Sequence, residues 1–282
     1  MKKIYIYHHL GLGDHISCNG FVRSILKKNR NHLIYLFCKK QYLKLISFLY
    51  RDEKKIRLIP IDVKNKSQKI YEKEIELYLK KIKKKNKIYK IGFEKFNDIY
   101  EQMYSYSNPV SHEMVFYHQL KLPYSKRFSE SYWKRDFKNE DKTFRKLVKN
   151  NKNNFAFIHD EPSLGYFIDS KFVTPGLKIV RNDKRENIFH MAKILEEAKE
   201  LHLMESSFRC MAETLNIKTK NIYLYIWRRR KIAPNYSRKL NKVIGAQKNW
   251  KIVLMNPKQK NLKFHIMNSL LRFRFYILSL IN

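Results

Sequence analysis

The chain has 282 residues, of which 44% are hydrophobic and 14% aromatic, so it can build one or two packed domains and is not disordered. Only seven glycines and seven prolines exclude collagen-like repeats and long flexible linkers. Lysine and arginine number 60 against 25 acidic residues, and the resulting charge of +35 attracts polyanions. An AT-rich coding sequence would give the same composition, so the charge alone does not identify a partner.

Cysteine usage and the apolar segments bear on the cellular location. The three cysteines, Cys18, Cys38 and Cys210, form no CxxC pair, which disfavours a zinc element or disulfide framework and favours the reducing cytoplasm. The first apolar run stops at His8, so we expect no secretion signal. Residues 264–281 are apolar but interrupted by cations, and we expect them to pack on the protein or to lie peripherally on the inner membrane face.

In chain order, apolar runs and amphipathic stretches alternate through the first half. We expect strands at 3–7, 32–38, 56–61 and 87–93, and helices at 16–27, 41–50 and 69–84. Residues 98–136 are rich in aromatic side chains and predict short helices and loops. A helix at 140–149 and the asparagine-rich run 150–154 follow, and this run marks the expected domain boundary.

The same alternation restarts in the second half. We expect strands at 155–159, 178–180, 201–204, 222–227 and 252–255, with helices at 188–199 and 206–215. The pattern predicts an α/β protein with two Rossmann-like lobes, residues 1–150 and 151–282, each built on a parallel sheet. Because ligands bind at the carboxyl ends of parallel strands, we expect the functional site in a cleft that the two lobes face.

A glycine turn follows the first expected strand. Gly11 and Gly13 allow a close approach of the backbone to a ligand, and the next helix presents its N–H groups there. The third glycine of the dinucleotide fingerprint is replaced by Ile16, so NAD binding is disfavoured. Asp14 stands at the mouth of this helix. It is either a general base that accepts a proton from a hydroxyl or an ordinary helix cap.

Three strand ends of the second half carry polar residues. Glu205, Ser206 and Ser207 begin a helix, where hydroxyl and N–H groups can hold a diphosphate, although an ordinary capped helix has the same residues. His159 ends the expected strand at 155–159, and Asp160 and Ser163 come just after it. Such polar residues at a strand end are typical of a binding loop. A buried core histidine remains the alternative for His159.

Two cations, Lys178 and Arg181, lie in and directly after the expected strand at 178–180. Arg181 offers a planar guanidinium that can clamp a phosphate through two hydrogen bonds, whereas Lys178 offers a point charge. Solvated surface residues are the alternative interpretation for this pair.

These motifs resemble GT-B glycosyltransferases of the heptosyltransferase type. The resemblance rests on Gly11-Leu12-Gly13-Asp14-His15-Ile16 and on residues 116–136, 155–163 and 198–208. It implies that residues 1–150 form the acceptor-side domain and 151–282 the nucleotide-sugar donor domain. It further implies that Asp14 is the base, that Ser206 and Ser207 bind the donor diphosphate, and that Glu205 lies near the nucleotide sugar.

The resulting expectation is a metal-independent glycosyltransferase without a cofactor, because the nucleotide sugar is a substrate. The enzyme would move a hexosyl or heptosyl group to a hydroxyl of a cell-surface glycan or lipid-linked acceptor, as in polysaccharide biosynthesis. Direct displacement assisted by a single carboxylate would invert the sugar carbon. Two alternatives stay open: a basic nucleic-acid-binding protein, and a GT-B scaffold that has lost its activity.

Overall fold

The structure is a computed structural model that describes residues 2–64, 66, 68–82, 86–93, 96–103, 111–149, 154–161, 166–227 and 245–255. The chain divides into two compact units. The first comprises Met1–Asp136 together with Lys242–Gln247, and the second comprises Phe137–Asn241 together with Lys248–Asn282. Most of the asparagine-rich run 150–154 and all of residues 264–281 lie outside the described residues, as does Ser163.

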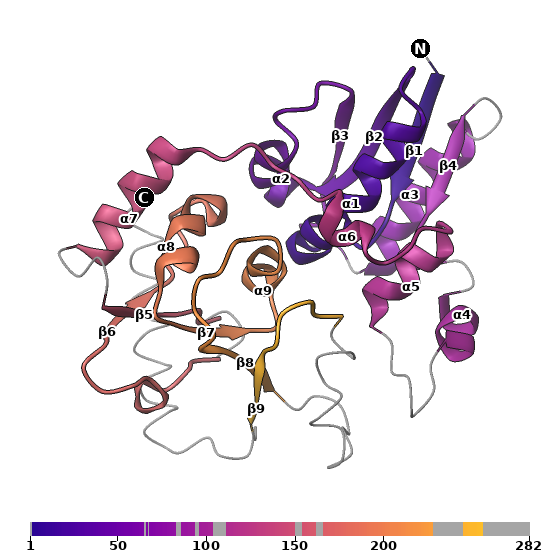
Figure 1. Cartoon of the computed structure of the whole chain (residues 1–282). Coiled ribbons are helices and arrows are strands. Elements are labelled where there is room, and N and C mark those ends of the chain that lie inside the picture. Colours follow the sequence, from indigo (N-terminus) through magenta and orange to yellow (C-terminus); the bar gives the residue numbers. More distant parts are fainter. Residues whose placement is uncertain are drawn as a thin grey trace. The chain divides into compact units, whose positions relative to one another are not determined.

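The first unit is built on a four-stranded parallel sheet with the order β3-β2-β1-β4 (Figure 1). The strands are β1 (Lys2–Tyr7), β2 (His32–Lys39), β3 (Ile56–Ile61) and β4 (Lys87–Lys90). Alternate residues of β1 point to opposite faces, so Ile4 and Ile6 are buried on one face and Tyr5 and Tyr7 on the other. Pro60 lacks an N–H donor, and it is tolerated because β3 is an edge strand.

Helices cover both faces of this sheet. Helix α1 (Leu12–Lys28) and α2 (Leu43–Leu49) lie on one face, and α3 (Gln68–Ile82) lies on the other (Figure 1). This second face carries Tyr5 and Tyr7 and is called the tyrosine face; Ile75 and Leu79 of α3 pack onto it. The aromatic-rich stretch forms α4 (Phe96–Met103), α5 (His112–Gln119) and α6 (Lys126–Ser129), which confirms the prediction of short helices.

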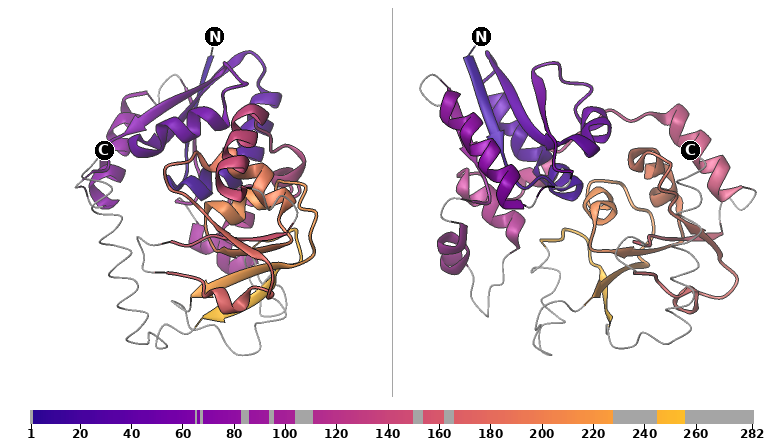
Figure 2. Two further views of the ribbon diagram at one scale, coloured as in Figure 1. Left: turned by 90° about the vertical axis from the view of Figure 1, so that its left-hand side faces the viewer. Right: turned by 180° about the vertical axis from the view of Figure 1, so that it is seen from behind.

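The second unit contains a five-stranded parallel sheet with the order β6-β5-β7-β8-β9. Its strands are β5 (Phe155–Ile158), β6 (Lys178–Arg181), β7 (Glu200–Met204), β8 (Ile222–Trp227) and β9 (Lys251–Met255). Helices α7 (Phe137–Val148), α8 (Ala192–Glu197) and α9 (Ser207–Ala212) cover one face (Figure 2). On the other face Ile168 and Val173, from the β5–β6 connection, pack with Met204 and Tyr225.

Two parallel α/β sheets are therefore confirmed, and the differences from expectation are local. The strand expected at 87–93 ends at Lys90, because Gly92 adopts a positive φ of 84° that breaks the extended conformation. The helix expected at 188–199 begins as a 3₁₀ turn, Ile188–Met191, and becomes α-helical only at Ala192. Within the described ranges, every helix is too short or too polar to span a bilayer.

The strand orders locate the places where ligands bind in such sheets. In the first unit the chain moves outward from β1 through β2 to β3 and then returns to β4, so the order reverses between β1 and β4. In the second unit it moves from β5 to β6 and returns to β7. Ligands of open α/β sheets bind at the carboxyl ends of the two strands that flank such a reversal. The predicted glycine turn and the predicted Glu205–Ser207 segment occupy these two positions.

Candidate functional site

In the first unit the glycine turn shapes the start of α1. Gly11 is the N-cap residue, and its N–H donates to Oδ2 of Asp14 over 3.1 Å. A Cβ atom at Gly11 would lie 2.6 Å from the same oxygen, so a larger residue would displace the carboxylate. Gly11 therefore lets Asp14 fold back over the turn, and Gly13 continues the first turn of the helix.

Asp14 combines a helix-capping contact with the properties of a base. Burial raises its pKa above the ordinary value, and the nearby carboxylate of Glu113 adds to this rise. His9, the N–H of Gly11 and Lys39 act in the opposite direction. The second carboxylate oxygen, Oδ1, makes no hydrogen bond among the described residues. A half-buried carboxylate with a raised pKa and an open oxygen can accept a proton near neutral pH.

The end of β4 lies beside this turn, as the strand order requires. His9 Nε2 lies 3.1 Å from the carbonyl oxygen of Gly92, and the N–H of Gly92 donates to Gln119 Oε1 over 2.8 Å. The ring of His9 also contacts Phe93 and Phe116 edge-on. Gly92 was not among the predicted site residues. A glycine near the end of an expected strand, the feature that pointed to Gly11, could have indicated it.

His15, which belongs to the glycine-turn motif, is a buried packing residue. Its ring is inaccessible to solvent and lies edge-on to His8, with 4.5 Å between the ring centres. Neither ring nitrogen of His15 has a hydrogen-bond partner among the described residues. Burial holds the pKa of His15 well below 6.5 and lowers that of His8 to about 3. Both rings are therefore neutral at pH 7.

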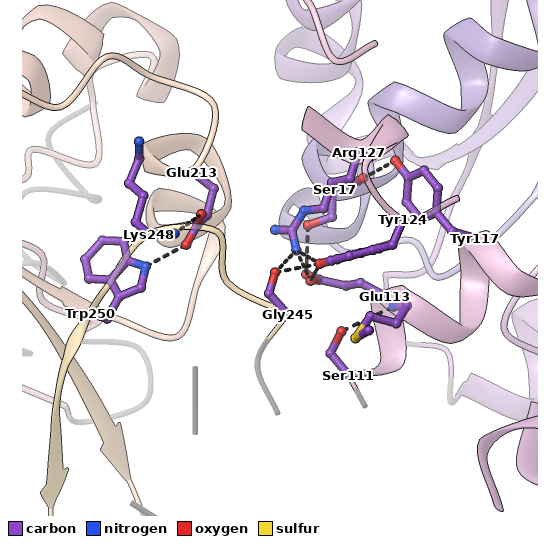
Figure 3. A network of polar contacts seen from close by, with 11 residues as sticks. Ser17, Ser111, Glu113, Tyr117, Tyr124, Arg127, Glu213, Gly245, Lys248 and Trp250 are labelled. Atoms are coloured by element: carbon purple, nitrogen blue, oxygen red, sulfur yellow. Dashed lines mark hydrogen bonds and ion pairs between the residues drawn. The ribbon is translucent and has the colours of Figure 1, made fainter. Parts of the chain in front are cut away.

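A buried polar network fixes α1 behind the turn (Figure 3). Ser17 Oγ donates to Glu113 Oε1 over 2.8 Å, and the guanidinium of Arg127, 1% exposed, pairs with the other oxygen of Glu113. Arg127 Nη1 and the hydroxyl of Tyr124 both donate to the carbonyl oxygen of Gly245, over 2.9 and 2.6 Å. Gly245 is thereby fastened to the first unit, and no sequence pattern indicated this contact.

In the second unit, the ends of β5 and β7 meet through two side chains. His159 follows β5 directly, and Ser206 is the N-cap of α9 after β7. Ser206 Oγ lies 3.2 Å from His159 Nδ1 and accepts the N–H of Phe208 at the same distance. Burial lowers the pKa of His159 to about 4, so the ring is neutral. In one tautomer Nδ1 accepts the hydroxyl proton of Ser206, and in the other Nδ1 donates to Ser206 Oγ.

Glu205 and Ser207 lie next to this contact with unused hydrogen-bonding capacity. Glu205 is exposed and Ser207 half-buried, and neither side chain has a partner among the described residues. His159, Glu205, Ser206 and Ser207 are thus brought together at the β5/β7 reversal. This edge offers hydroxyl donors, a neutral imidazole and a carboxylate, a combination suited to a phosphorylated nucleoside.

Asp160 and Arg181 are each other's partners. The guanidinium of Arg181 pairs with Asp160 Oδ2 and donates to the carbonyl of Ile168 over 3.2 Å. The N–H of Ile168 donates to Asp160 Oδ1 over 2.9 Å. Burial raises the pKa of Asp160, although Arg181 favours its charged form. The pair joins the ends of β5 and β6, and the Arg181 side chain stays 40% exposed at the carboxyl edge.

Lys178 stands apart from the other predicted donor-binding residues. It begins β6 and pairs in register with Phe155 at the start of β5, so it lies at the amino edge of the sheet. Its ammonium donates to the carbonyl of Val148 over 3.3 Å. Arg181, at the other end of the same strand, occupies the carboxyl edge. The structure therefore does not bring Lys178 to the β5/β7 reversal.

A second buried network crosses the middle of the same sheet. His202 Nδ1 lies 2.8 Å from the hydroxyl of Tyr225, and His202 Nε2 lies 3.1 Å from Glu200 Oε2. Glu200 also accepts from the hydroxyl and N–H of Thr174, over 2.5 and 3.1 Å. Burial lowers the pKa of His202, although Glu200 opposes the change. No sequence signal pointed to this network, because Glu200 and His202 belong to a run that reads as an ordinary buried strand.

In the parts of the chain that the structure describes, no three His, Cys, Asp or Glu residues are grouped as metal ligands. The carboxyl edges of the two sheets carry the hydroxyls of Ser206 and Ser207, the cation of Arg181, and the carboxylates of Asp14 and Glu205. This set can bind a polar anionic ligand and transfer a proton.

Known proteins resemble this chain in structure but not in sequence. No family model matches the sequence, and no curated protein matches it. The structure is similar to a family 9 glycosyltransferase from Veillonella parvula, with 10% identity, a TM-score of 0.50, and coverage of 90% of this chain and 87% of that one. It is equally similar to ADP-heptose LPS heptosyltransferase II from E. coli, with 8% identity, a TM-score of 0.50 and 90% coverage of both chains. The chain therefore has the α/β fold of the GT-B glycosyltransferases, with a Rossmann-like parallel sheet in each of its two units.

Proposed function

We propose that this protein is a glycosyltransferase that moves a sugar from a nucleotide-diphosphate donor to an acceptor hydroxyl. One observation carries the proposal: Asp14 follows β1 in the first unit, His159 and Ser206 follow β5 and β7 in the second, and these strands flank the points where the strand order reverses. The fold shared with two solved glycosyltransferases supports it. A shared fold alone does not assign an activity, so the proposal rests on the residues at the carboxyl edges of the two sheets.

Asp14 is the proposed general base. The acceptor oxygen attacks the sugar carbon, the bond from that carbon to the phosphate oxygen breaks, and the acceptor proton passes to Asp14 Oδ1. The raised pKa of Asp14 makes it a stronger base than an exposed aspartate. Its bond to the N–H of Gly11 fixes the carboxylate while Oδ1 stays open. Direct displacement of this kind inverts the configuration of the sugar carbon.

The β5/β7 edge of the second unit is the proposed donor site. Ser207 and the N-cap Ser206 would donate hydrogen bonds to the diphosphate. The single hydroxyl proton of Ser206 is available for this when His159 carries its ring proton on Nδ1 and donates it to Ser206 Oγ. Glu205, exposed beside them, would accept from a hydroxyl of the nucleoside. The exposed part of Arg181 adds positive charge that stabilises the leaving diphosphate, while Asp160 holds it in place. These protein groups suffice for a metal-independent reaction.

The acceptor is proposed to be a cell-surface glycan or a lipid-linked sugar reached from the cytoplasmic side of the membrane. The E. coli neighbour is named for ADP-heptose. ADP and ADP-linked sugars are therefore the first ligands to test, followed by those of UDP and GDP.

The experiment compares wild type with Asp14→Asn in an assay of nucleoside-diphosphate release from a panel of nucleotide sugars, with a bacterial lipid extract as acceptor. We expect the variant to lose transfer and to keep the thermal stabilisation by nucleoside diphosphate. An active Asp14→Asn enzyme excludes Asp14 as the base. Tight, steeply salt-dependent RNA binding without transfer supports the nucleic-acid-binding alternative, and nucleotide binding without transfer in wild type supports an inactive scaffold.

A further inference from the structure

Helix α3 exposes apolar side chains on the face that points away from its sheet. Its residues Ile75 and Leu79 are buried against the tyrosine face of the first sheet. On the opposite side Ile70 and Leu77 are each 50% exposed, whereas the ring of Tyr78 contacts Phe37 and Tyr5 of the sheet. Exposed aliphatic side chains grouped on one helix face mark an interaction surface more often than isolated ones do.

The exposed row also carries lysines. Ile70, Leu77 and Lys81 follow one another at spacings of seven and four residues, which places them along one line of the helix. Lys73 and Lys80 flank this line, and all three lysines are exposed. None of the three forms an ion pair with another described residue. We call Ile70, Lys73, Leu77, Lys80 and Lys81 the α3 face.

The acidic residues near the α3 face do not balance these charges. Glu74 pairs with Lys66 over 2.7 Å, and Glu76 pairs with Lys90 over 2.6 Å. Residues 62–90 contain eleven lysines and four acidic residues. The positive charge per residue is therefore higher in this stretch of sequence than in the chain as a whole, and Lys73, Lys80 and Lys81 lie beside the exposed Ile70 and Leu77.

We propose that the α3 face docks onto an anionic lipid surface. Aliphatic side chains at the centre enter the boundary between headgroups and acyl chains, and flanking lysines bind the phosphates of anionic headgroups. A nucleic acid would use the lysines but has no place for Ile70 and Leu77. A second copy of this helix would bring like charges together. Because vesicle binding needs no substrate, this inference is tested separately from the proposed transferase activity.

The test is co-sedimentation of the full chain with vesicles of phosphatidylcholine alone or of phosphatidylcholine mixed with phosphatidylglycerol. We expect binding to the mixed vesicles only. The double variant Ile70→Ser/Leu77→Ser should bind at least about tenfold more weakly, because two inserted side chains are lost. The triple variant Lys73→Gln/Lys80→Gln/Lys81→Gln should weaken binding similarly. Circular dichroism confirms that both variants are folded.

Two matched controls separate the α3 face from the general charge. Phe137→Ser removes an apolar side chain that is 68% exposed in the other unit, and Lys142→Gln/Lys199→Gln/Lys220→Gln removes three exposed charges there. Both controls should bind mixed vesicles like wild type. Equal losses in the controls and the α3 variants, or unchanged binding in the α3 variants, overturn the proposal. So does conversion of a dimer to a monomer by Ile70→Ser/Leu77→Ser, which would identify a second copy as the occupant.

Discussion

The hydroxyl of Ser206 lies 3.2 Å from Nδ1 of His159 and thereby joins the ends of β7 and β5. The same oxygen caps α9 through the N–H of Phe208. Replacement of Ser206 by alanine removes both contacts, so we expect a loss of about 1 kcal/mol in the free energy of unfolding, as is usual for an N-cap. Urea denaturation measures this change.

Ser111 offers the matched control for that variant. It caps α5 in the first unit by accepting the N–H of Met114 over 3.2 Å. Ser111→Ala should cost a similar free energy of unfolding and leave nucleotide affinity unchanged. If Ser206→Ala and Ser111→Ala change nucleotide affinity equally, Ser206 acts only as a helix cap.

The raised pKa of Asp14 predicts the pH dependence of transfer. Burial raises the pKa, so the base becomes protonated at a higher pH than an ordinary aspartate with pKa 3.8. Transfer should therefore fall on acidification at a pH above the usual aspartate range, as a pH–rate profile would measure. Asp14→Asn should reduce transfer by about 10²–10⁴-fold. A profile that stays flat down to pH 4 would exclude Asp14 as the titrating base.

The buried His8 ring makes the stability of the protein sensitive to acid. Its pKa is about 3 in the folded state against 6.5 when unfolded. The folded value is the lower one, so stability is complete above about pH 6.5 and is lost as the pH falls toward 3. At pH 5 the loss from His8 alone is about 2 kcal/mol. Urea unfolding at pH 7 and pH 5 checks this, and His8→Phe should reduce the difference; an equal difference in the variant would contradict the account.

Gly245 is closely surrounded by residues of the buried arginine network. Its φ is +62°, and a Cβ there would lie 2.4 Å from Ser111 Oγ and from the hydroxyl of Tyr124. We expect Gly245→Ala to cost about 1–3 kcal/mol of unfolding free energy, because an alanine is strained at this φ and the surrounding network must shift. Gly176 also has a positive φ, +88°, with nothing within 4 Å of its Cβ position. Gly176→Ala therefore measures the backbone cost alone, and an equal loss in both variants would exclude a role for the contacts.

The sequence contained most of the information on the sheets. Strands such as β1, β5 and β8 are short apolar runs bounded by polar or glycine residues, so their positions followed from the pattern. The candidate sites followed in turn, because parallel strands end at one edge and Asp14, His159 and Ser206 each stand just beyond a strand. Lys178 illustrates the limit of that rule: as the first residue of its strand it belongs to the opposite edge.

Contacts between distant residues were beyond the reach of the sequence. Arg181 and Asp160 are 21 residues apart, and Arg127 and Gly245 are 118 residues apart. Each pair forms because strand order and helix packing bring two chain segments together. Neither the hydrophobic periodicity of the sequence nor a local motif indicates such a contact. A single sequence also offers no pattern for a buried ion pair, because the same residue types are common on the surface.

Isothermal titration with ADP, UDP and GDP tests the central claim most directly, since the β5/β7 edge is proposed to hold the donor diphosphate. The account predicts that wild type binds at least one of them and that Ser206→Ala/Ser207→Ala binds it at least about tenfold more weakly. This estimate follows because hydrogen bonds to a charged group contribute about 1.5–3 kcal/mol and about 1.4 kcal/mol corresponds to tenfold in affinity. Ser111→Ala should bind like wild type. Failure of wild type to bind any of the three, or equal affinity in the double variant, would contradict the account.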